Sequence, residues 1–137
     1  MYYPLLIFEG RTASLLSVRL CSGNASGPSR LLPHLRWMVQ RLRRGFPEVE
    51  IIYRSDAAAA VPAVYCVLRE IGVDYLIGIG TNEAFERKAA PIVERLAKEY
   101  QRTGRPLRHY THFWHQARSW PWRQRILLKS GIWCIRR

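Results

Sequence analysis

The chain has 137 residues, of which 48% are hydrophobic, and its formal net charge is +12 at pH 7. This length suits one ordinary domain, and the apolar content is too high for an intrinsically disordered protein. No segment approaches the roughly 20 consecutive apolar residues of a membrane span, and the N-terminus lacks a secretory signal pattern, so we expect a cytoplasmic protein without a membrane partner.

The first part of the chain predicts a β-hairpin followed by a helix. Two strand-like runs, Tyr3 to Phe8 and Ser14 to Leu20, flank a turn at Glu9 to Thr12. After a loop, apolar residues recur at helical spacing from about Ser29 to Arg44. Several arginines lie off this apolar stripe: Arg36, Arg41, Arg43 and Arg44. They could contact DNA, although a solvated helix face is the commoner use of such a pattern.

The next segment predicts a parallel βαβ unit. Strand-like runs at Val49 to Arg54 and Tyr75 to Gly80 flank a helix between Pro62 and Gly72. The connecting helix requires the two strands to be parallel. Asp56 follows the first strand, so we expect it at the carboxyl edge of the sheet, where open α/β folds bind ligands. The alternative is that Asp56 is only a polar strand end or the cap of the next helix.

The last part predicts a long helix and an antiparallel strand pair. Asn82 is a suitable cap for a helix that stops at Gly104, and Pro91 inside it predicts a kink or a restart. Two strand-like runs follow, Leu107 to His115 and Arg123 to Leu128.

Histidines and tryptophans are concentrated in this last part. Three histidines recur at every third position: His109, His112 and His115. In a strand, successive members point to opposite faces, which argues against a metal site. Three tryptophans are interleaved with arginines: Trp114, Trp120 and Trp122. They could stack on unpaired bases, but packing of the hairpin is the commoner use.

Three segments resemble a known family: Tyr53 to Asp56, Gly72 to Gly78 and Ala117 to Trp120. In order and spacing they resemble the catalytic domain of bacterial insertion-sequence DDE transposases, of the kind called transposase DDE domain group 1. The opening run Tyr3 to Phe8 fits the same family. The resemblance reaches about Lys129, so we expect a partial catalytic domain over residues 1–129 and a divergent tail over residues 130–137.

The resemblance implies an α/β fold with an incomplete RNase H-like core. Such a core would hold the antiparallel hairpin and the parallel βαβ strands, with helices packed on the sheet and a C-terminal antiparallel β pair. In the intact family, three acids hold two Mg²⁺ or Mn²⁺ ions for DNA strand cleavage and transfer. Asp56 matches the second acid by position and is the candidate catalytic and metal-binding residue. The first and third acids have no counterpart, so we expect no stably bound metal and no activity from this chain alone.

No other acid is well placed to substitute for the missing two. The chain has only two aspartates, and Asp74 precedes its strand, so we expect it roughly 15–20 Å from Asp56, at the opposite edge of the sheet. Glu9 lies in the hairpin turn, and Glu48 and Glu50 lie at the start of the strand. The family usually has glycine where this chain has Ser55, and that substitution reduces the backbone freedom beside the acid.

The positive charge indicates DNA as the partner, because arginine's planar fork suits phosphate oxygens. The candidate DNA-binding residues are Arg54, Arg118, Arg123 and Arg125. The alternative function is that of a small basic, non-enzymatic protein that binds DNA, or that docks to an intact transposase or to itself through an open sheet edge. A third possibility is an unstable product of a decayed gene.

Cysteine usage indicates neither a disulfide framework nor a zinc site. The three cysteines are scattered: Cys21, Cys66 and Cys134. We expect reduced thiols, with Cys66 buried in a helix.

Overall fold

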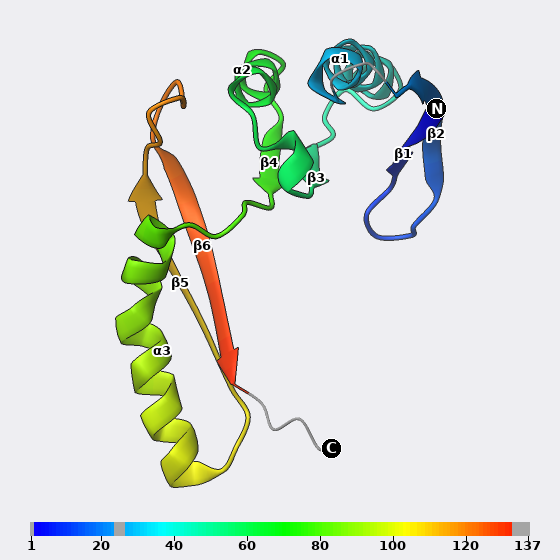
Figure 1. Ribbon diagram of the computed structural model, residues 1–137. Helices are drawn as coiled ribbons and strands as arrows, with labels where there is room; N and C mark the ends of the chain where they lie inside the picture. The colour runs from blue at the N-terminus through cyan, green and yellow to red at the C-terminus, as the bar shows by residue number, and fades with distance from the viewer. Residues whose placement is uncertain (1, 24–26, 133–137) are drawn as a thin grey trace. The chain divides into compact units, whose positions relative to one another are not determined.

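The computed structural model describes residues 2–23 and 27–132 (Figure 1). The chain divides into two compact units, Met1–Ile79 and Gly80–Arg137. This division does not follow the boundary predicted between Lys129 and Ser130, which stays a prediction.

The first unit alternates strands and helices. In chain order its elements are β1 (Tyr2–Phe8), β2 (Leu15–Ser22), α1 (Gly27–Gly45), β3 (Ile52–Ser55), the 3-10 turn η1 (Ala57–Ala59), α2 (Pro62–Glu70) and β4 (Asp74–Ile77). The hairpin prediction is confirmed, since β1 pairs antiparallel with β2. The βαβ prediction is also confirmed, since β3 pairs parallel with β4. Helix α1 starts earlier than predicted, and β3 starts at Ile52 rather than at Val49.

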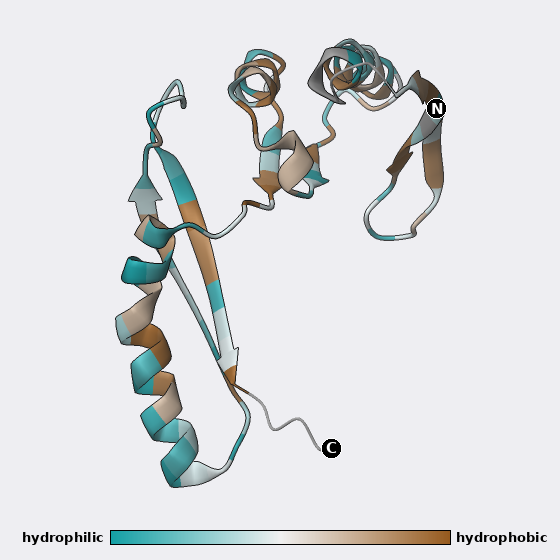
Figure 2. Ribbon diagram, viewed as in Figure 1, coloured by the Kyte–Doolittle hydropathy of each residue, from teal (hydrophilic) through white to brown (hydrophobic). Residues whose placement is uncertain are grey.

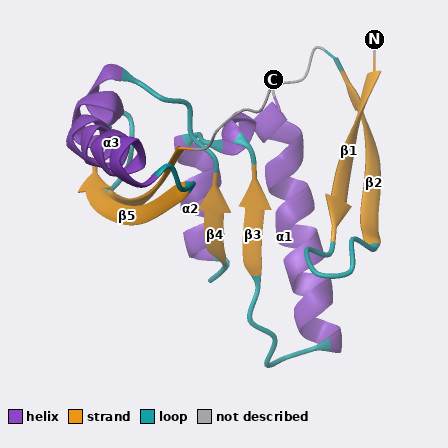
Figure 3. Ribbon diagram, turned by 90° about the horizontal axis from the view of Figure 1, so that it is seen from below, coloured by secondary structure: helices purple, strands orange, loops and turns teal. Residues whose placement is uncertain are grey.

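The core of this unit lies between the two helices and one face of the parallel pair. Alternate residues of β3 and β4 are half-buried towards the helices, and both helices lie on the same side of the pair in Figure 3. The centre of the core comes from α2, where Val64 and Leu68 are fully buried. Full burial of such side chains stabilises a fold by about 1.5–3 kcal/mol each. The remaining buried members of the cluster are Leu31, Leu35, Val39, Ala59 and Val73.

Two arginines of α1 hold that helix to α2. Arg36 forms an ion pair with Glu70, which lowers the pKa of that carboxyl. Arg43 donates to the carbonyl oxygens of Ile71 at 2.7 Å and Gly72 at 2.8 Å, just beyond the C-terminus of α2. Cations at this end of a helix are favourable because its last carbonyls lack partners within the helix. These two members of the arginine set in α1 therefore have structural roles.

The second unit packs one helix on a strand pair. Its elements are α3 (Glu83–Thr103), β5 (Leu107–His115) and β6 (Gln124–Ile132). Asn82 caps α3 by accepting from Phe85 N at 3.0 Å, and Gly104 ends it with a left-handed φ of 63°. Of the kink or restart predicted at Pro91, the restart is wrong, because α3 is one continuous helix through that residue, and the kink stays a prediction. Pro91 is exposed, so water can reach the carbonyl that loses its backbone donor.

The strand pair is longer than the sequence predicted. Strands β5 and β6 pair in antiparallel register from Leu107↔Ile132 to His115↔Gln124. Strand β6 therefore continues past Leu128, because Lys129, Ser130 and Gly131 all have partners in β5. The hydrophobic middle of β6 appears brown in Figure 2, and its buried residue Ile126 faces the same side as Leu128. That face packs against α3, where Leu96 is buried.

Two further expectations concern the burial of the cysteines and the presence of a membrane-spanning helix. Cys66 is exposed, so the prediction of a buried thiol is wrong: α2 turns Val64, Val67 and Leu68 to the core and Cys66 away from it. Cys21 is buried and free, and Cys134 lies outside the described residues. Within the described ranges, no helix has the length and apolar character that crossing a bilayer requires.

His34 should make the stability of the first unit depend on pH. Its ring is buried, its Nε2 lies 2.9 Å from Ser17 Oγ, and it stacks on Trp37. Burial, with a smaller effect of the positive charge on Arg19, lowers the pKa of His34 from its ordinary value of 6.5. The unfolded chain then binds the proton more readily, so the free energy of unfolding should fall as pH drops below about 6.5.

Chemical denaturation at pH 7.5 and pH 5.5 measures this effect. The variant His34→Gln should lose less stability between these two pH values than the wild-type chain. An equal loss in both proteins would contradict the assignment to His34.

Candidate functional site

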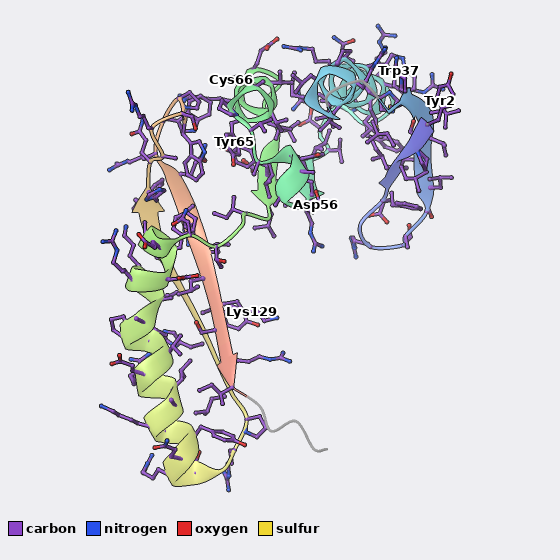
Figure 4. The ribbon with its side chains drawn as sticks, in the orientation of Figure 1. Tyr2, Trp37, Asp56, Tyr65, Cys66 and Lys129 are labelled. Atoms are coloured by element: carbon purple, nitrogen blue, oxygen red, sulfur yellow. The ribbon has the colours of Figure 1, made fainter. Side chains whose placement is uncertain are left out.

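Asp56 lies at the carboxyl end of β3, as expected from the sequence (Figure 4). It also begins the η1 turn, which was not predicted. Its backbone is extended, with φ −79° and ψ −171°, and its Oδ1 accepts a hydrogen bond from Ala58 N at 3.0 Å. The side chain is exposed. Asp56 is therefore the cap of a short 3-10 turn, and its second carboxylate oxygen has no protein hydrogen bond among the described residues.

The backbone beside Asp56 is fixed by the neighbouring strand. Gly78 N, directly after β4, donates to the carbonyl oxygen of Ser55 at 2.9 Å. A Cβ added at Gly78 would lie 3.5 Å from Asp56 Cα, so the two strand ends leave room for little more than hydrogen at this position. The parallel pairing thus continues to the residue before the acid and holds its main chain in place.

Tyr53 contributes a half-buried phenol on the helix-facing side of β3. The pKa of Tyr53 is raised above its ordinary value, first because burial disfavours the phenolate and further because of the negative charge of Asp56. The phenol therefore stays protonated near the acid at neutral pH. We did not identify the Tyr53 phenol as a site group from the sequence, because aromatic residues are common in strands.

The other acids do not join Asp56. Asp74 is paired with Ile52 at the start of the parallel pair, four residues before the position of Asp56. At about 3.3 Å per residue, this places the two aspartates roughly 13 Å apart along the strands, at opposite ends as predicted. Glu9 accepts hydrogen bonds from Arg11 N and from Thr12, which close the hairpin turn and lower its pKa.

The chain's own residues do not fit a pair of metal ions at Asp56. Glu48 and Glu50 are exposed and precede β3, on the side away from Asp56. In the part of the chain that the structure describes, no three or more His, Cys, Asp or Glu residues gather where they could hold a metal ion. Two-metal phosphoryl chemistry needs several carboxylates within reach of both ions. Asp56 could supply one ligand, and the others would have to come from outside these residues.

The β5–β6 pair has one face free of α3, and cationic and aromatic side chains alternate along it. We call this surface the open face. Its residues are Arg108, Tyr110, His112 and Trp114 from β5, and Arg125, Leu127 and Lys129 from β6. The two aromatics are 64% and 53% exposed. Each pairs across the strands with a cation, Tyr110 with Lys129 and Trp114 with Arg125.

A second arginine reaches the same tryptophan. The guanidinium carbon of Arg123 lies 5.0 Å from the centre of the Trp114 ring. Two of the four arginines predicted to bind DNA, Arg123 and Arg125, are thus brought together around one exposed aromatic. Arg118 is exposed in the turn between β5 and β6, and Arg54 is exposed on β3 in the first unit. Tyr110 and Lys129 were not identified from the sequence. The alternation of exposed residues along β5 and β6 adds both of them to the open face.

The opposite face of the strand pair takes up the remaining histidines. His109 and His115 face α3, whereas His112 lies on the open face, so the prediction that they do not converge is confirmed. His109 contacts Arg95 with a closest N···N distance of 3.2 Å. His115 sits between aromatic rings, 4.9 Å from Phe85 and 5.6 Å from Trp120. Trp120 therefore packs within the unit.

Comparison with known proteins gives one match. Residues 1–132 match the family model described as transposase DDE domain group 1. This match spans nearly the whole chain and confirms the family that the sequence segments indicated. No curated protein and no solved structure matches the chain.

Two substitutions at Asp56 should separate its capping role from a ligand role. Asp56→Ala removes the acceptor for Ala58 N and should lower the free energy of unfolding by about 0.5–1 kcal/mol. Asp56→Asn keeps a side-chain oxygen acceptor and should stay within a few tenths of a kcal/mol of wild type. Thermal and urea denaturation of the three proteins measure this. Equal destabilisation by both variants would contradict the capping role.

Proposed function

The chain belongs to the transposase DDE domain group 1 family, and from this membership we propose that it acts in DNA transposition as part of an RNase H-like catalytic domain. Its partner would be DNA of an insertion sequence, in the cytoplasm of a bacterium. The observation that carries this proposal is the position of Asp56, an exposed acid directly after a strand of a parallel pair. Ligand sites of open α/β sheets are built at this edge.

Within such a domain, Asp56 would be the second of three acids. The resemblance between Tyr53 to Asp56 and the family's segment supports this role, as does the carboxylate oxygen of Asp56 that the η1 turn does not use. Mg²⁺ or Mn²⁺, where bound, would supply charge stabilisation for phosphoryl transfer. The contribution of this chain would be to hold one carboxylate at a fixed point, because the Gly78 contact and the Ala58 hydrogen bond immobilise Asp56.

This chain by itself would not cleave DNA. One exposed carboxylate does not fit a two-metal centre, and Asp74 lies at the other end of the strand pair. Activity would need the first and third acids from outside the described residues. Residues 1–129 would then correspond to the partial catalytic domain, and the chain would bind no metal stably.

The open face supports direct contact with DNA. Arginine and lysine neutralise phosphates, and exposed aromatic rings stack on unpaired bases. Trp114, with Arg123 and Arg125 beside it, combines both kinds of group within a few ångströms. Arg118 in the adjoining turn would extend this contact, and Arg54 would contact DNA near Asp56.

A second candidate function is that of a non-enzymatic basic protein that binds DNA or interacts with an intact transposase. The observation that favours it is the net charge of +12 together with strand edges on β1 and β3 that have no partner among the described residues. Strand edges of this kind pair readily with other chains.

A plasmid-nicking assay tests the catalytic half of the proposal. Supercoiled DNA incubated with the wild-type chain and Mg²⁺ or Mn²⁺ should stay supercoiled, because the chain offers only one of the required acids. Asp56→Asn serves as the matched variant. Nicking by the wild-type chain that Asp56→Asn abolishes would show that one acid of this chain suffices, which contradicts the proposal.

Binding to a fluorescent single-stranded oligonucleotide tests the DNA half. The affinity of the wild-type chain should fall steeply between 50 and 200 mM salt. Trp114→Ala should weaken binding by about tenfold, the effect of losing one stacked base of roughly 1–3 kcal/mol. Arg125→Gln should weaken it more than Arg102→Gln, a variant of equal charge at an exposed helix position. Equal effects of the two arginine variants would rule out the open face as the contact.

A further inference from the structure

A hollow of about 510 Å³ lies in the first unit between β2 and α1. Its lining residues are Ser17, Val18 and Arg19 of β2 and Pro33, His34 and Trp37 of α1. None of these residues belongs to the surroundings of Asp56 or to the open face. The hollow is therefore a surface that the proposed function does not use.

The indole of Trp37 lines this hollow and is held in place from within the unit. Its ring stacks on the buried imidazole of His34, with ring centres 5.4 Å apart and planes inclined by 17°. His34 is in turn held by Ser17, whose Oγ lies 2.9 Å from His34 Nε2. Trp37, labelled on α1 in Figure 4, nevertheless remains 51% exposed. A fixed and half-exposed indole offers a platform on which another flat ring can stack.

One cation already lies near the exposed indole. The guanidinium carbon of Arg41 is 5.8 Å from the centre of the Trp37 ring. A cation–π contact at an exposed site is weaker than the stacking of a nucleic-acid base on an aromatic side chain. A base can therefore displace Arg41 from the indole. The displaced guanidinium is then free to pair with a phosphate of the same strand.

The arginines of α1 divide into two sets. Arg36 and Arg43 hold α1 to α2. The other three are exposed: Arg30, Arg41 and Arg44. No carboxylate pairs with any of these three among the described residues, and α1 itself contains no acidic residue. Their positive charge is therefore available to an anionic ligand.

The exposed arginines and the tryptophan form one line along the helix, which we call the α1 stripe. Its residues are Arg30, Trp37, Arg41 and Arg44. At 3.6 residues per turn, these positions fall within about 60° of one another around the helix axis, and at 1.5 Å per residue they span about 21 Å. One stacked DNA strand carries a phosphate about every 3.4 Å, so this length matches roughly six nucleotides. Arg19 extends the positive charge across the hollow to β2.

The combination of an indole with a line of cations favours a nucleic-acid strand over other ligands. An inorganic anion would pair with the arginines and leave the indole uncovered, and an apolar molecule would leave the arginines unpaired. A free nucleotide would occupy the hollow but would reach only the cations next to it. A single strand brings an unpaired base to Trp37 and phosphates to the whole length of the α1 stripe.

We propose that the α1 stripe and the hollow beside it bind a single strand of DNA, with one unpaired base stacked on Trp37. Arg41 and Arg19 bind the phosphates on either side of this base, and the two remaining arginines of the stripe bind phosphates farther along the strand. The inference goes beyond the proposed function, because it depends neither on Asp56 nor on the open face.

Photo-cross-linking locates the stacked base. The probe is a six-nucleotide thymidine oligonucleotide that carries 5-iodouracil at one position, and it is irradiated with the full chain. Mass spectrometry of the digested protein should find Trp37 among the cross-linked residues. No cross-link to Trp37 would overturn the inference, whether or not Trp114 is cross-linked. A cross-link to Trp114 reports separately on the open face, so the failure of one site is distinguishable from the failure of the other.

Binding measurements in a chain that carries Trp114→Ala test the individual residues. Fluorescence anisotropy with the labelled six-nucleotide strand should show about tenfold weaker binding when Trp37→Leu is added. Trp37→Phe keeps an aromatic ring on His34 and should weaken binding less than threefold. Equal effects of the two substitutions would contradict stacking on Trp37.

The cations and the length of the ligand are tested in the same chain. Arg41→Gln should weaken binding at least threefold more than Arg102→Gln, a variant of equal charge on the exposed surface of α3. The six-nucleotide strand should bind at least tenfold more tightly than thymidine monophosphate. Equal effects of the two arginine variants, or equal affinity for the strand and the mononucleotide, would overturn the assignment of a strand to the α1 stripe.

Discussion

The parallel pairing of β3 and β4 is the constraint on which the rest of the first unit depends. It is maintained from one side only, because Val64 and Leu68 of α2 and the apolar stripe of α1 are buried against that side. The pairing extends to Gly78 N and Ser55 O, so it also fixes the main chain that presents Asp56. The position of the candidate acid is thus a consequence of how the helices pack on this strand pair.

Helix α1 contributes to this core and also lines a cavity beside it. Helix α1 packs on α2 along one part of its apolar stripe, and another part lines a cavity of about 660 Å³ that residues of β1 and β3 also line. Asp56 lines this cavity, and so does β3, whose second edge has no partner among the residues that the structure describes. The cationic open face belongs to the second unit.

Sequence periodicity was sufficient for most elements because it reports which face of an element is buried. The βαβ unit and the alternation of His109, His112 and His115 were predicted in this way and confirmed. The Asn82 cap was predicted from its residue type and is also confirmed. The role of Asp56 as a ligand stays a prediction, whereas its capping role is visible in the hydrogen bond from Ala58. The family match and the sequence segments agree on the class of protein.

Features that depend on contacts with other segments of the chain, or with solvent, were not predictable from the sequence. Strand β6 runs to Ile132 because β5 offers it partners there, although Lys129 to Gly131 have no strand-like composition. Helix α3 passes through Pro91 because that residue faces solvent. Cys66 is exposed because α2 turns Val64, Val67 and Leu68 to the core and Cys66 away from it.

A titration with Mn²⁺ followed by NMR tests the central claim most directly, that this chain offers one metal ligand rather than a metal site. Paramagnetic broadening reports the distance of each amide from the ion. We expect weak, non-saturating broadening around Ser55 to Ala58 and Gly78 that reaches no plateau at one or two ions per chain. Saturable broadening centred on Asp56 at stoichiometric Mn²⁺, and lost in Asp56→Asn, would contradict it.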